Sequence, residues 1–302
     1  MERGTTTLNI HLLKLQMVEL LEKHHKITAV ADQLGLKQPT VTFHMKSLEQ
    51  ELGVRLFESR AGKTVLTEAG KALYHYAVKI NALSQEAERV VKEFDGLGRG
   101  TLKIGASYVP ATYMLPPILS RFSAAFPRIS LSLAVKTAPV IQDMLLNHEI
   151  DLGIMSAEPF DMAPLIRETL CEDELVVIFA PRHRLAECEQ LSPEQLGEVP
   201  FIFHGQESST RRLTDRWALN NGIDLKATME LDSLEAIKQV AMLGESVSFL
   251  SRQAVRVEVE RGELDWRPIP RNPYKRYVYC AYNADRHRSA LIDQFIDELK
   301  KG

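Results

Sequence analysis

The stretch from Gln38 to Gly53 constrains the fold of this 302-residue chain most strongly. Pro39 suits the first turn of a helix, where a backbone N–H lacks an intrahelical partner, and Gly53 suits the left-handed position just beyond a helix end. Between them, apolar residues recur at helical spacing, at Val41, Met45, Leu48 and Leu52. The pattern predicts an amphipathic helix with a polar outer face. Such a helix could lie on any protein surface, or it could enter the major groove of DNA.

Two further helices are predicted upstream. Residues 8–24 predict the first, with Lys14 on its exposed side. Residues 27–36 predict a short second helix, for which Thr28 is the expected N-cap and Gly35 the expected C-terminal stop. Two short helices around a tight turn form a helix-turn-helix, whose second helix docks in the DNA groove. The pair therefore favours DNA binding over an ordinary surface role.

A longer set of positions around this pair is more specific. In chain order they are Ala31, Leu34, Gln38, Pro39, Thr42, Leu48, Glu49, Leu52, Gly53, Leu56, Phe57 and Leu66–Gly70. In order and spacing this set resembles the N-terminal signature of LysR-type transcriptional regulators. The family usually has Ser where this chain has Thr42, and often Arg or Lys where it has Phe43. It usually places an Arg at the position of Ser59, whereas here the arginine follows at Arg60.

The resemblance implies a winged helix-turn-helix over residues 1–67 that binds double-stranded DNA at an operator with paired half-sites. The residues expected at the DNA are Gln38, Pro39, Thr40, Thr42, Phe43, Lys46, Arg60 and Lys63. Arg60 and Lys63 flank the tip of the predicted wing, which could also be a solvated hairpin. Residues 1–68 carry nine Lys and Arg against eight Asp and Glu, so local clusters of cations must contact the phosphates.

Residues 68–95 predict a long helix with a heptad seam. Its apolar residues alternate at spacings of three and four, at Leu73, Tyr76, Ile80, Leu83, Ala87, Val90 and Phe94. The seam could lie on its own domain, but a 3.5-residue period favours a coiled coil with a second helix of the same kind. The resemblance implies a linker helix that pairs two subunits into a homodimer, and it further suggests a homotetramer. Three glycines within residues 96–100 then predict a hinge.

From Thr101 onward, predicted strands alternate with predicted helices, which indicates α/β architecture with parallel sheets and crossover connections. The resemblance implies a two-lobed effector-binding domain over residues 101–302, similar to periplasmic binding proteins. Its first lobe would comprise about residues 101–172 and 269–302, and its second about 173–268. The expected fold is therefore a helix-rich DNA-binding domain, a linker helix and a two-lobed α/β domain.

Two segments of this domain follow predicted strands and open predicted helices, where open α/β sheets bind ligands. The first contains Ser107, and the second contains Ser208, Ser209 and Thr210. Hydroxyls and free backbone N–H groups there favour an anion, although Ser208 or Ser209 could be a simple N-cap. The resemblance implies that Ser107, Ser209 and Thr210 face an inter-lobe cleft. By the same geometry, weaker candidates are Thr137 and Ser156.

Other functional classes find less support. Phosphate-loop, nucleophile-elbow and zinc-helix motifs are absent, and the nine histidines lack metal-ligand spacing, with His183 and His287 expected in solvated loops. We therefore expect no catalytic residue, metal or cofactor, although an enzyme built on the α/β half and a solute-binding protein are the alternatives.

The sequence also bears on the expected compartment. The N-terminus lacks a secretory signal pattern, and no apolar run reaches the length of a membrane span. Cys171, Cys188 and Cys280 have no metal-type spacing and are expected as buried, reduced thiols. We expect a cytoplasmic, sequence-specific transcriptional regulator without membrane contact, controlled by a small anionic effector between the two C-terminal lobes.

Overall fold

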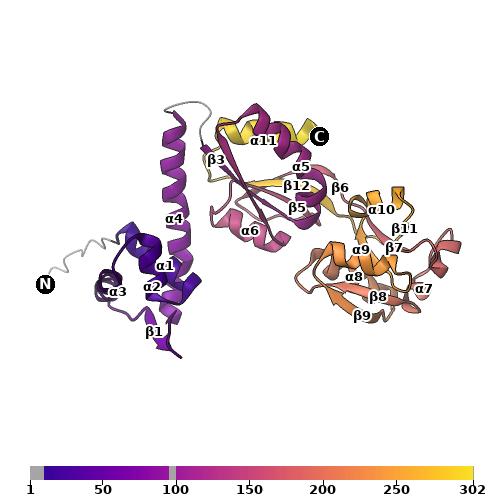
Figure 1. The fold of residues 1–302 in the computed structure, drawn as a ribbon, viewed down its shortest axis with the longest axis horizontal. Coiled ribbons are helices and arrows are strands. Elements are labelled where there is room, and N and C mark those ends of the chain that lie inside the picture. The colour runs from indigo at the N-terminus through magenta and orange to yellow at the C-terminus, as the bar shows by residue number, and fades with distance from the viewer. Residues whose placement is uncertain (1–9, 95–99, 302) are drawn as a thin grey trace. The chain divides into compact units, whose positions relative to one another are not determined.

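The computed structural model describes residues 10–94 and 100–301. The chain forms two compact units (Figure 1). The first comprises Met1–Asp95 together with Asn147–Glu149, and the second comprises Gly96–Leu146 and Ile150–Gly302. Each unit has its own hydrophobic core.

The first unit opens with three helices that share one core: α1 (Leu12–His24), α2 (Ile27–Leu34) and α3 (Gln38–Leu52). The predicted apolar stripe of α3 is confirmed, because Val41, Met45 and Leu48 are buried. Gly35 and Gly53 follow α2 and α3 with φ of +64° and +68°, in the left-handed region that favours glycine. The helix-turn-helix predicted from the sequence is therefore present.

Three local predictions for these helices are wrong. The first helix begins at Leu12; residue 8 lies outside the described residues. Thr28 lies inside α2, whose N-cap is Lys26 without a side-chain cap. Lys14 is buried, and its Nζ lies 2.5 Å from the Glu51 carboxylate and 3.1 Å from the Ser47 hydroxyl. A buried charge is tolerated here because α3 supplies its partners.

The wing is a hairpin of two antiparallel strands, β1 (Phe57–Arg60) and β2 (Lys63–Leu66). Ala61 and Gly62 turn the chain with φ of +49° and +75°, as a two-residue hairpin turn requires. The Glu49 carboxylate accepts the backbone N–H groups of Leu56 at 2.8 Å and Phe57 at 3.1 Å. This residue of α3 therefore fixes where the wing begins.

Helix α4 (Glu68–Phe94) packs on α1 through a face that buries Ala77 and Val78. The middle of the predicted heptad seam lies on another face and is exposed to solvent: Tyr76 is 62%, Ile80 42% and Leu83 44% exposed, whereas Leu73 at its start is half-buried and packs on the core of the first unit. Nothing in the described part of the first unit covers the three exposed side chains. The side chain of Phe94 and residues 96–99 of the predicted hinge lie outside the described residues.

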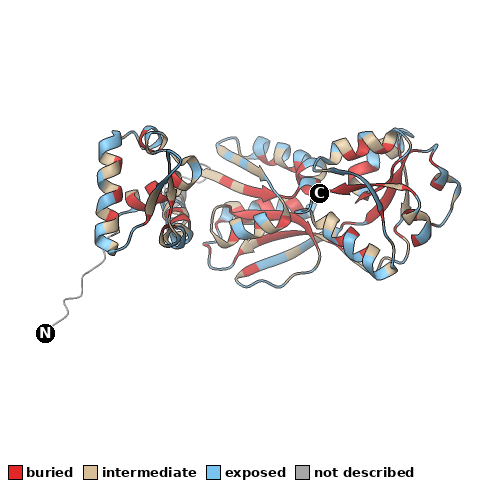
Figure 2. Cartoon of the chain, turned by 90° about the horizontal axis from the view of Figure 1, so that it is seen from below, coloured by how far each residue is buried: buried red, intermediate tan, exposed pale blue. Residues whose placement is uncertain are grey.

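The first lobe of the second unit is built on a five-stranded sheet. Its strands, in spatial order, are β4 (Ile129–Val135), β3 (Gly100–Ala106), β5 (Leu152–Ala157), β12 (Tyr277–Asn283) and β6 (Leu165–Glu172). The π-helical turn η1 (Pro110–Met114), α5 (Leu115–Ala125) and α11 (Ala290–Lys301) pack on one face, and α6 (Ala138–Leu146) packs on the other. Buried residues fill both faces of the central strands (Figure 2).

The second lobe contains antiparallel strands in the order β10 (Ser248–Ser251), β7 (Leu175–Phe179) and β11 (Asp265–Pro268), and a parallel pair, β8 (Pro200–His204) and β9 (Lys226–Leu231). A bridge between Phe201 and Val247 joins the two sets. The surrounding helices are η2 (Arg184–Glu187), α7 (Pro193–Gly197), α8 (Ser209–Asn221), α9 (Leu234–Met242), η3 (Arg252–Val255) and α10 (Arg256–Glu260).

The expected parallel pairing is confirmed for β3 with β4 and β5 and for β8 with β9, but both lobes also contain antiparallel pairs that the pattern did not predict. In the first lobe, β12 runs antiparallel to β5 and β6, and in the second lobe β7 pairs antiparallel with both neighbours. The sequence pattern missed β6 and β11. Both lie at sheet edges, and β6 alternates between buried and exposed residues less regularly than a half-buried strand should.

The chain passes between the lobes twice, between β6 and β7 and between β11 and β12. Asp173 and Arg276 lie at these two crossings, both buried, with the Arg276 guanidinium 2.9 Å from the Asp173 carboxylate. The Asp173 N–H donates to the Arg276 carbonyl at 2.9 Å, and the Ser251 hydroxyl donates to the Asp173 carboxylate at 2.5 Å. The two crossing strands are thus held to each other.

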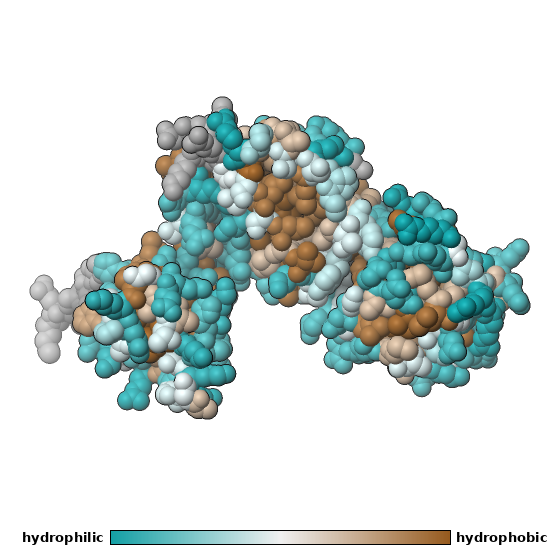
Figure 3. Space-filling view, viewed as in Figure 1, coloured by the Kyte–Doolittle hydropathy of each residue, from teal (hydrophilic) through white to brown (hydrophobic). Residues whose placement is uncertain are grey.

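On the face shown in Figure 3, hydrophilic residues predominate, and apolar patches lie on the first lobe in the region of α5 and on the second lobe. None of the helices within residues 10–94 and 100–301 has the length and apolar character needed to cross a membrane. Two minor expectations are wrong. His183 is buried, and its Nδ1 accepts the Leu185 N–H at 3.2 Å. Of the three cysteines only Cys280 is buried, and Cys171 and Cys188 are half-buried.

Candidate ligand pocket and nucleic-acid interface

One pocket of about 470 Å³ lies between the two lobes of the second unit. Its lining includes every effector-binding residue predicted from the sequence: Ser107, Thr137, Ser156, Ser208, Ser209 and Thr210. The first three belong to the first lobe and the last three to the second. The structure therefore brings these residues together, and their role in ligand binding stays a prediction.

The first lobe contributes the ends of its parallel strands. Ser107 follows β3, Thr137 follows β4 and Ser156 lies near the end of β5, so the three meet at the carboxyl edge of the sheet. The Ser107 hydroxyl oxygen accepts the Ser156 backbone N–H at 2.9 Å. The Ser156 hydroxyl is buried and has no hydrogen-bond partner in the part of the chain that the structure describes. A buried hydroxyl without a partner is costly unless a ligand or water completes it.

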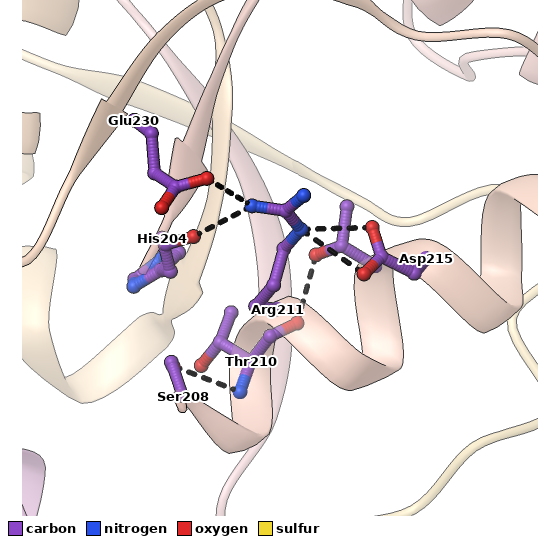
Figure 4. A network of polar contacts seen from close by, with 7 residues as sticks. His204, Ser208, Thr210, Arg211, Asp215 and Glu230 are labelled. Carbon is purple, nitrogen blue, oxygen red and sulfur yellow. Dashed lines mark hydrogen bonds and ion pairs between the residues drawn. The ribbon is translucent and has the colours of Figure 1, made fainter. Parts of the chain in front are cut away.

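The second lobe contributes the N-terminus of α8. Ser208 is an N-cap, since its hydroxyl oxygen accepts the Thr210 N–H at 3.2 Å, as one of the sequence alternatives held. Thr210 is buried, and its backbone oxygen accepts the Thr214 hydroxyl at 2.9 Å (Figure 4). Because Ser208, Ser209 and Thr210 line the pocket, the N-terminus of α8, which is the positive end of the helix dipole, lies at the pocket.

Arg276 is a lining residue that sequence reasoning missed. Its Nη1 donates to the Thr210 hydroxyl oxygen at 2.9 Å, its other side faces Asp173, and its Nε has no partner among the described residues. The segment Pro273–Arg276 reads as a polar loop, so its composition gave no hint. Arg276 lies immediately before the last strand, where the chain crosses between the lobes. That position could have predicted its place in an inter-lobe pocket.

Arg211 forms a polar network beside the pocket (Figure 4). Its guanidinium donates to Glu230 at 2.7 Å, to both Asp215 oxygens at 2.9 and 3.0 Å, and to the His204 carbonyl at 3.1 Å. Glu230 lines the pocket, and this ion pair offsets its charge. The remaining lining carboxylates, Glu207 and Asp232, belong to exposed residues.

His204 lines the pocket from β8 and is buried. Burial lowers the pKa of its imidazole to about 4, because the cationic form is poorly solvated there and the guanidinium groups of Arg276 and Arg211 also repel it. Its Nε2 lies 2.8 Å from the Phe249 carbonyl, which can only accept. The ring is therefore neutral at physiological pH and carries its proton on Nε2.

The predicted DNA-binding residues lie on α3 and on the wing. On α3, Gln38, Pro39, Phe43 and Lys46 are exposed, and Thr40 and Thr42 are half-buried. The Thr42 hydroxyl donates to the Gln38 carbonyl at 3.1 Å, so its proton is already engaged. Arg60 and Lys63 face each other across the wing, and Arg60 lies 2.7 Å from the Glu58 carboxylate. Their contact with DNA stays a prediction.

No cluster of His, Cys, Asp or Glu that could hold a metal ion is found in the described ranges. A winged helix-turn-helix joined through a long helix to a two-lobed α/β domain with an inter-lobe pocket is the architecture of a ligand-responsive DNA-binding regulator. Residues 12–71 match the bacterial regulatory helix-turn-helix proteins of the lysR family, and residues 95–302 match the LysR substrate binding domain. The chain therefore belongs to the LysR family of transcriptional regulators.

Relatives and solved structures agree with this assignment. The probable RuBisCO transcriptional regulator of Porphyra purpurea is 31% identical over 299 residues, which cover 97% of this chain and 94% of the relative. The corresponding protein of Synechocystis sp. is 32% identical, over 95% of this chain and 84% of the relative. These relatives are transcriptional regulators and not enzymes.

Two solved structures illustrate the fold. A full-length OxyR variant of Pseudomonas aeruginosa superposes with a TM-score of 0.70 at 24% identity, and covers 96% of this chain and 95% of its own. The CcmR regulatory domain of Synechocystis, in complex with 2-PG, has a TM-score of 0.61 at 30% identity, and covers 67% of this chain and 96% of its own.

Proposed function

We propose that this LysR-family regulator binds a small anionic effector in the pocket between its two lobes, and that the effector controls how α3 and the wing bind an operator. One observation carries the effector proposal. The buried Ser156 hydroxyl of the first lobe, without a partner among the described residues, lines the same pocket as the helix start at Thr210 in the second lobe. A ligand that bridges the lobes would satisfy both.

The charge distribution supports an anion at the buried end of the pocket. Arg276 is the cation of the lining, and the N-terminus of α8 adds a positive dipole end beside it. Glu230 is offset by Arg211, whereas Glu207 and Asp232 belong to the exposed part of the lining. A fitting ligand therefore carries an anionic group at one end and hydrogen-bond donors, such as hydroxyls, at the other. The 2-PG complex of the CcmR regulatory domain supports a small ligand in this class.

A ligand in this pocket would contact both lobes, and it could therefore change how they are arranged relative to each other. Besides the crossing strands, Arg216 of α8 pairs with Glu158 of the first lobe, and the Lys238 Nζ lies 5.4 Å from the centre of the Tyr113 ring across the lobes. A ligand that binds the closed arrangement more tightly than the open one shifts their equilibrium. A coupling of about 1–3 kcal/mol is enough to change operator affinity at least fivefold.

The test begins with native mass spectrometry of the full-length protein against small organic phosphates and carboxylates, 2-PG included. Calorimetry with the tightest binder then compares wild type with Ser156→Ala, because this hydroxyl has no hydrogen-bond partner among the described residues and its removal should leave the fold intact. Ser123→Ala, on an exposed position of α5, is the control. Thr210→Val is a poorer probe, since it would also leave Arg276 without its acceptor.

A weaker affinity of about tenfold for Ser156→Ala, with Ser123→Ala unchanged, is expected for one lost hydrogen bond to a charged group. Equal affinities for all three proteins would place the effector elsewhere. If none of the anions binds, the effector is of another class.

We further propose that Gln38 at the start of α3 reads a base edge and that the α4 seam pairs two subunits on paired half-sites. Gln38 is exposed, and its amide can pair bidentately with adenine, which contributes about 1–3 kcal/mol of discrimination. Gln38→Ala should therefore weaken operator binding more than binding to random DNA at the same salt. Equal losses on both DNAs would contradict base reading by this residue. The homotetramer suggested by the resemblance stays a prediction.

A further inference from the structure

Phe43 stands out on the outer face of α3. It is 68% exposed, the most exposed aromatic side chain among the described residues, and its one ring neighbour is His44, at 5.7 Å between ring centres. Residues three and four apart share a helix face, so Phe43 lies between Pro39 and Lys46. All three are exposed, on the side opposite the buried stripe of α3. Phe43 therefore contributes nothing to the core of its own domain.

The surroundings of Phe43 decide what could cover it. It is the one large apolar side chain of α3 that is exposed, so the helix offers no apolar patch of the size that a protein partner needs. Its exposed neighbours on the same helix include the amide of Gln38 and the ammonium group of Lys46, which suit base edges and phosphates. The exposed face of α3 is polar and cationic and carries a single apolar side chain. It is therefore complementary to a polar, anionic surface that carries single apolar groups.

The major groove is such a surface, because the one apolar group that base edges present there is the 5-methyl of thymine. We propose that Phe43 reads the methyl group of a thymine in each operator half-site, and so contributes to sequence specificity. This inference rests on the proposed role of α3 as the helix that enters the groove. It assigns an apolar specificity contact to the position where the family signature often has a cation.

The experiment removes the methyl group alone. A duplex is first enriched from randomised DNA by the full-length wild-type protein, and each thymine of its half-sites is then replaced by deoxyuridine. Binding is measured at fixed salt for wild type, Phe43→Ser, Phe43→Leu and Gln38→Ala. Because Phe43 is exposed, its substitution should leave the melting temperature unchanged, which serves as the folding control.

Wild type should bind about fourfold more weakly when the contacted thymine of one half-site loses its methyl, the value of one apolar carbon removed from water. Replacement in both half-sites should cost about fifteenfold. Phe43→Ser should lose this sensitivity, and Phe43→Leu should retain part of it. A thymine outside the half-sites should show no effect in any protein.

Other outcomes separate the hypothesis that α3 reads bases from the hypothesis that Phe43 reads a thymine methyl group. If deoxyuridine weakens no complex of the wild type while Gln38→Ala still lowers the preference for the enriched duplex, α3 reads bases but Phe43 does not read a methyl. If Phe43→Ser is penalised as strongly as wild type, another side chain contacts the methyl group. If neither Gln38→Ala nor Phe43→Ser changes the preference over random DNA, the proposed reading role of α3 fails as well.

Discussion

The buried histidine of the pocket makes the stability of the second lobe depend on pH in a defined direction. His204 has a pKa of about 4 in the folded chain, against an ordinary value of 6.5, because burial disfavours its cation. Between these values the unfolded chain binds a proton that the folded chain does not, so stability is lost as the pH falls. For this one group, the free energy of unfolding should decrease by about 2 kcal/mol between pH 8 and pH 5.

The assay is urea unfolding followed by tryptophan fluorescence. The chain has two tryptophans, Trp217 on α8 and Trp266 on β11, and both lie in the second lobe with His204. The comparison is with His204→Gln, whose amide can still donate to the Phe249 carbonyl but cannot take up a proton. Other titrating groups, including His183, whose pKa burial also lowers, are the same in both proteins and cancel in the difference.

The variant should therefore lose about 2 kcal/mol less than wild type over this pH range. If the two proteins lose stability in parallel, burial does not hold the His204 imidazole neutral in the folded protein.

Two further predictions concern the crossing strands and the linker helix. Asp173→Asn should lower the free energy of unfolding by about 3–5 kcal/mol in the same assay, because it leaves the buried Arg276 guanidinium without its counter-charge. A loss below about 1 kcal/mol, the value of an exposed ion pair, would contradict a stabilising buried ion pair between Asp173 and Arg276. Ile80→Asp should convert the dimer to monomer in sedimentation experiments and weaken binding to paired half-sites, because it puts a charge in the exposed α4 seam. An unchanged mass would show that the seam is not the dimer contact.

The sequence predicted what depends on local pattern. The glycines after α2 and α3, the apolar stripe of α3 and the hairpin tip at Ala61–Gly62 follow from backbone conformation and helical periodicity, and the structure has them. All six predicted residues line the pocket: they follow strands or open helices, where ligands of α/β folds bind, and the family resemblance also pointed to Ser107, Ser209 and Thr210.

What the sequence could not supply depends on partners far along the chain. Lys14 was assigned to solvent because its own helix gave it a polar neighbourhood, whereas its partner Glu51 is on another helix. Arg276 contacts Thr210 and Asp173, and neither proximity is visible until the two lobes are folded. The antiparallel return of β12 likewise follows from the crossing between lobes and not from the pattern of the strand itself.

Ligand binding between the lobes and operator binding by the N-terminal domain should be coupled if the proposed function is right. The most direct measurement is the Kd of the tightest-binding anion of the panel for the full-length protein, with and without saturating operator duplex. Coupling is reciprocal, so the two values should differ by about fivefold or more for wild type. The same difference should be seen with Ser123→Ala, while Ser156→Ala binds the anion more weakly in both conditions. Identical Kd values with and without operator would show that the inter-lobe pocket does not control operator binding.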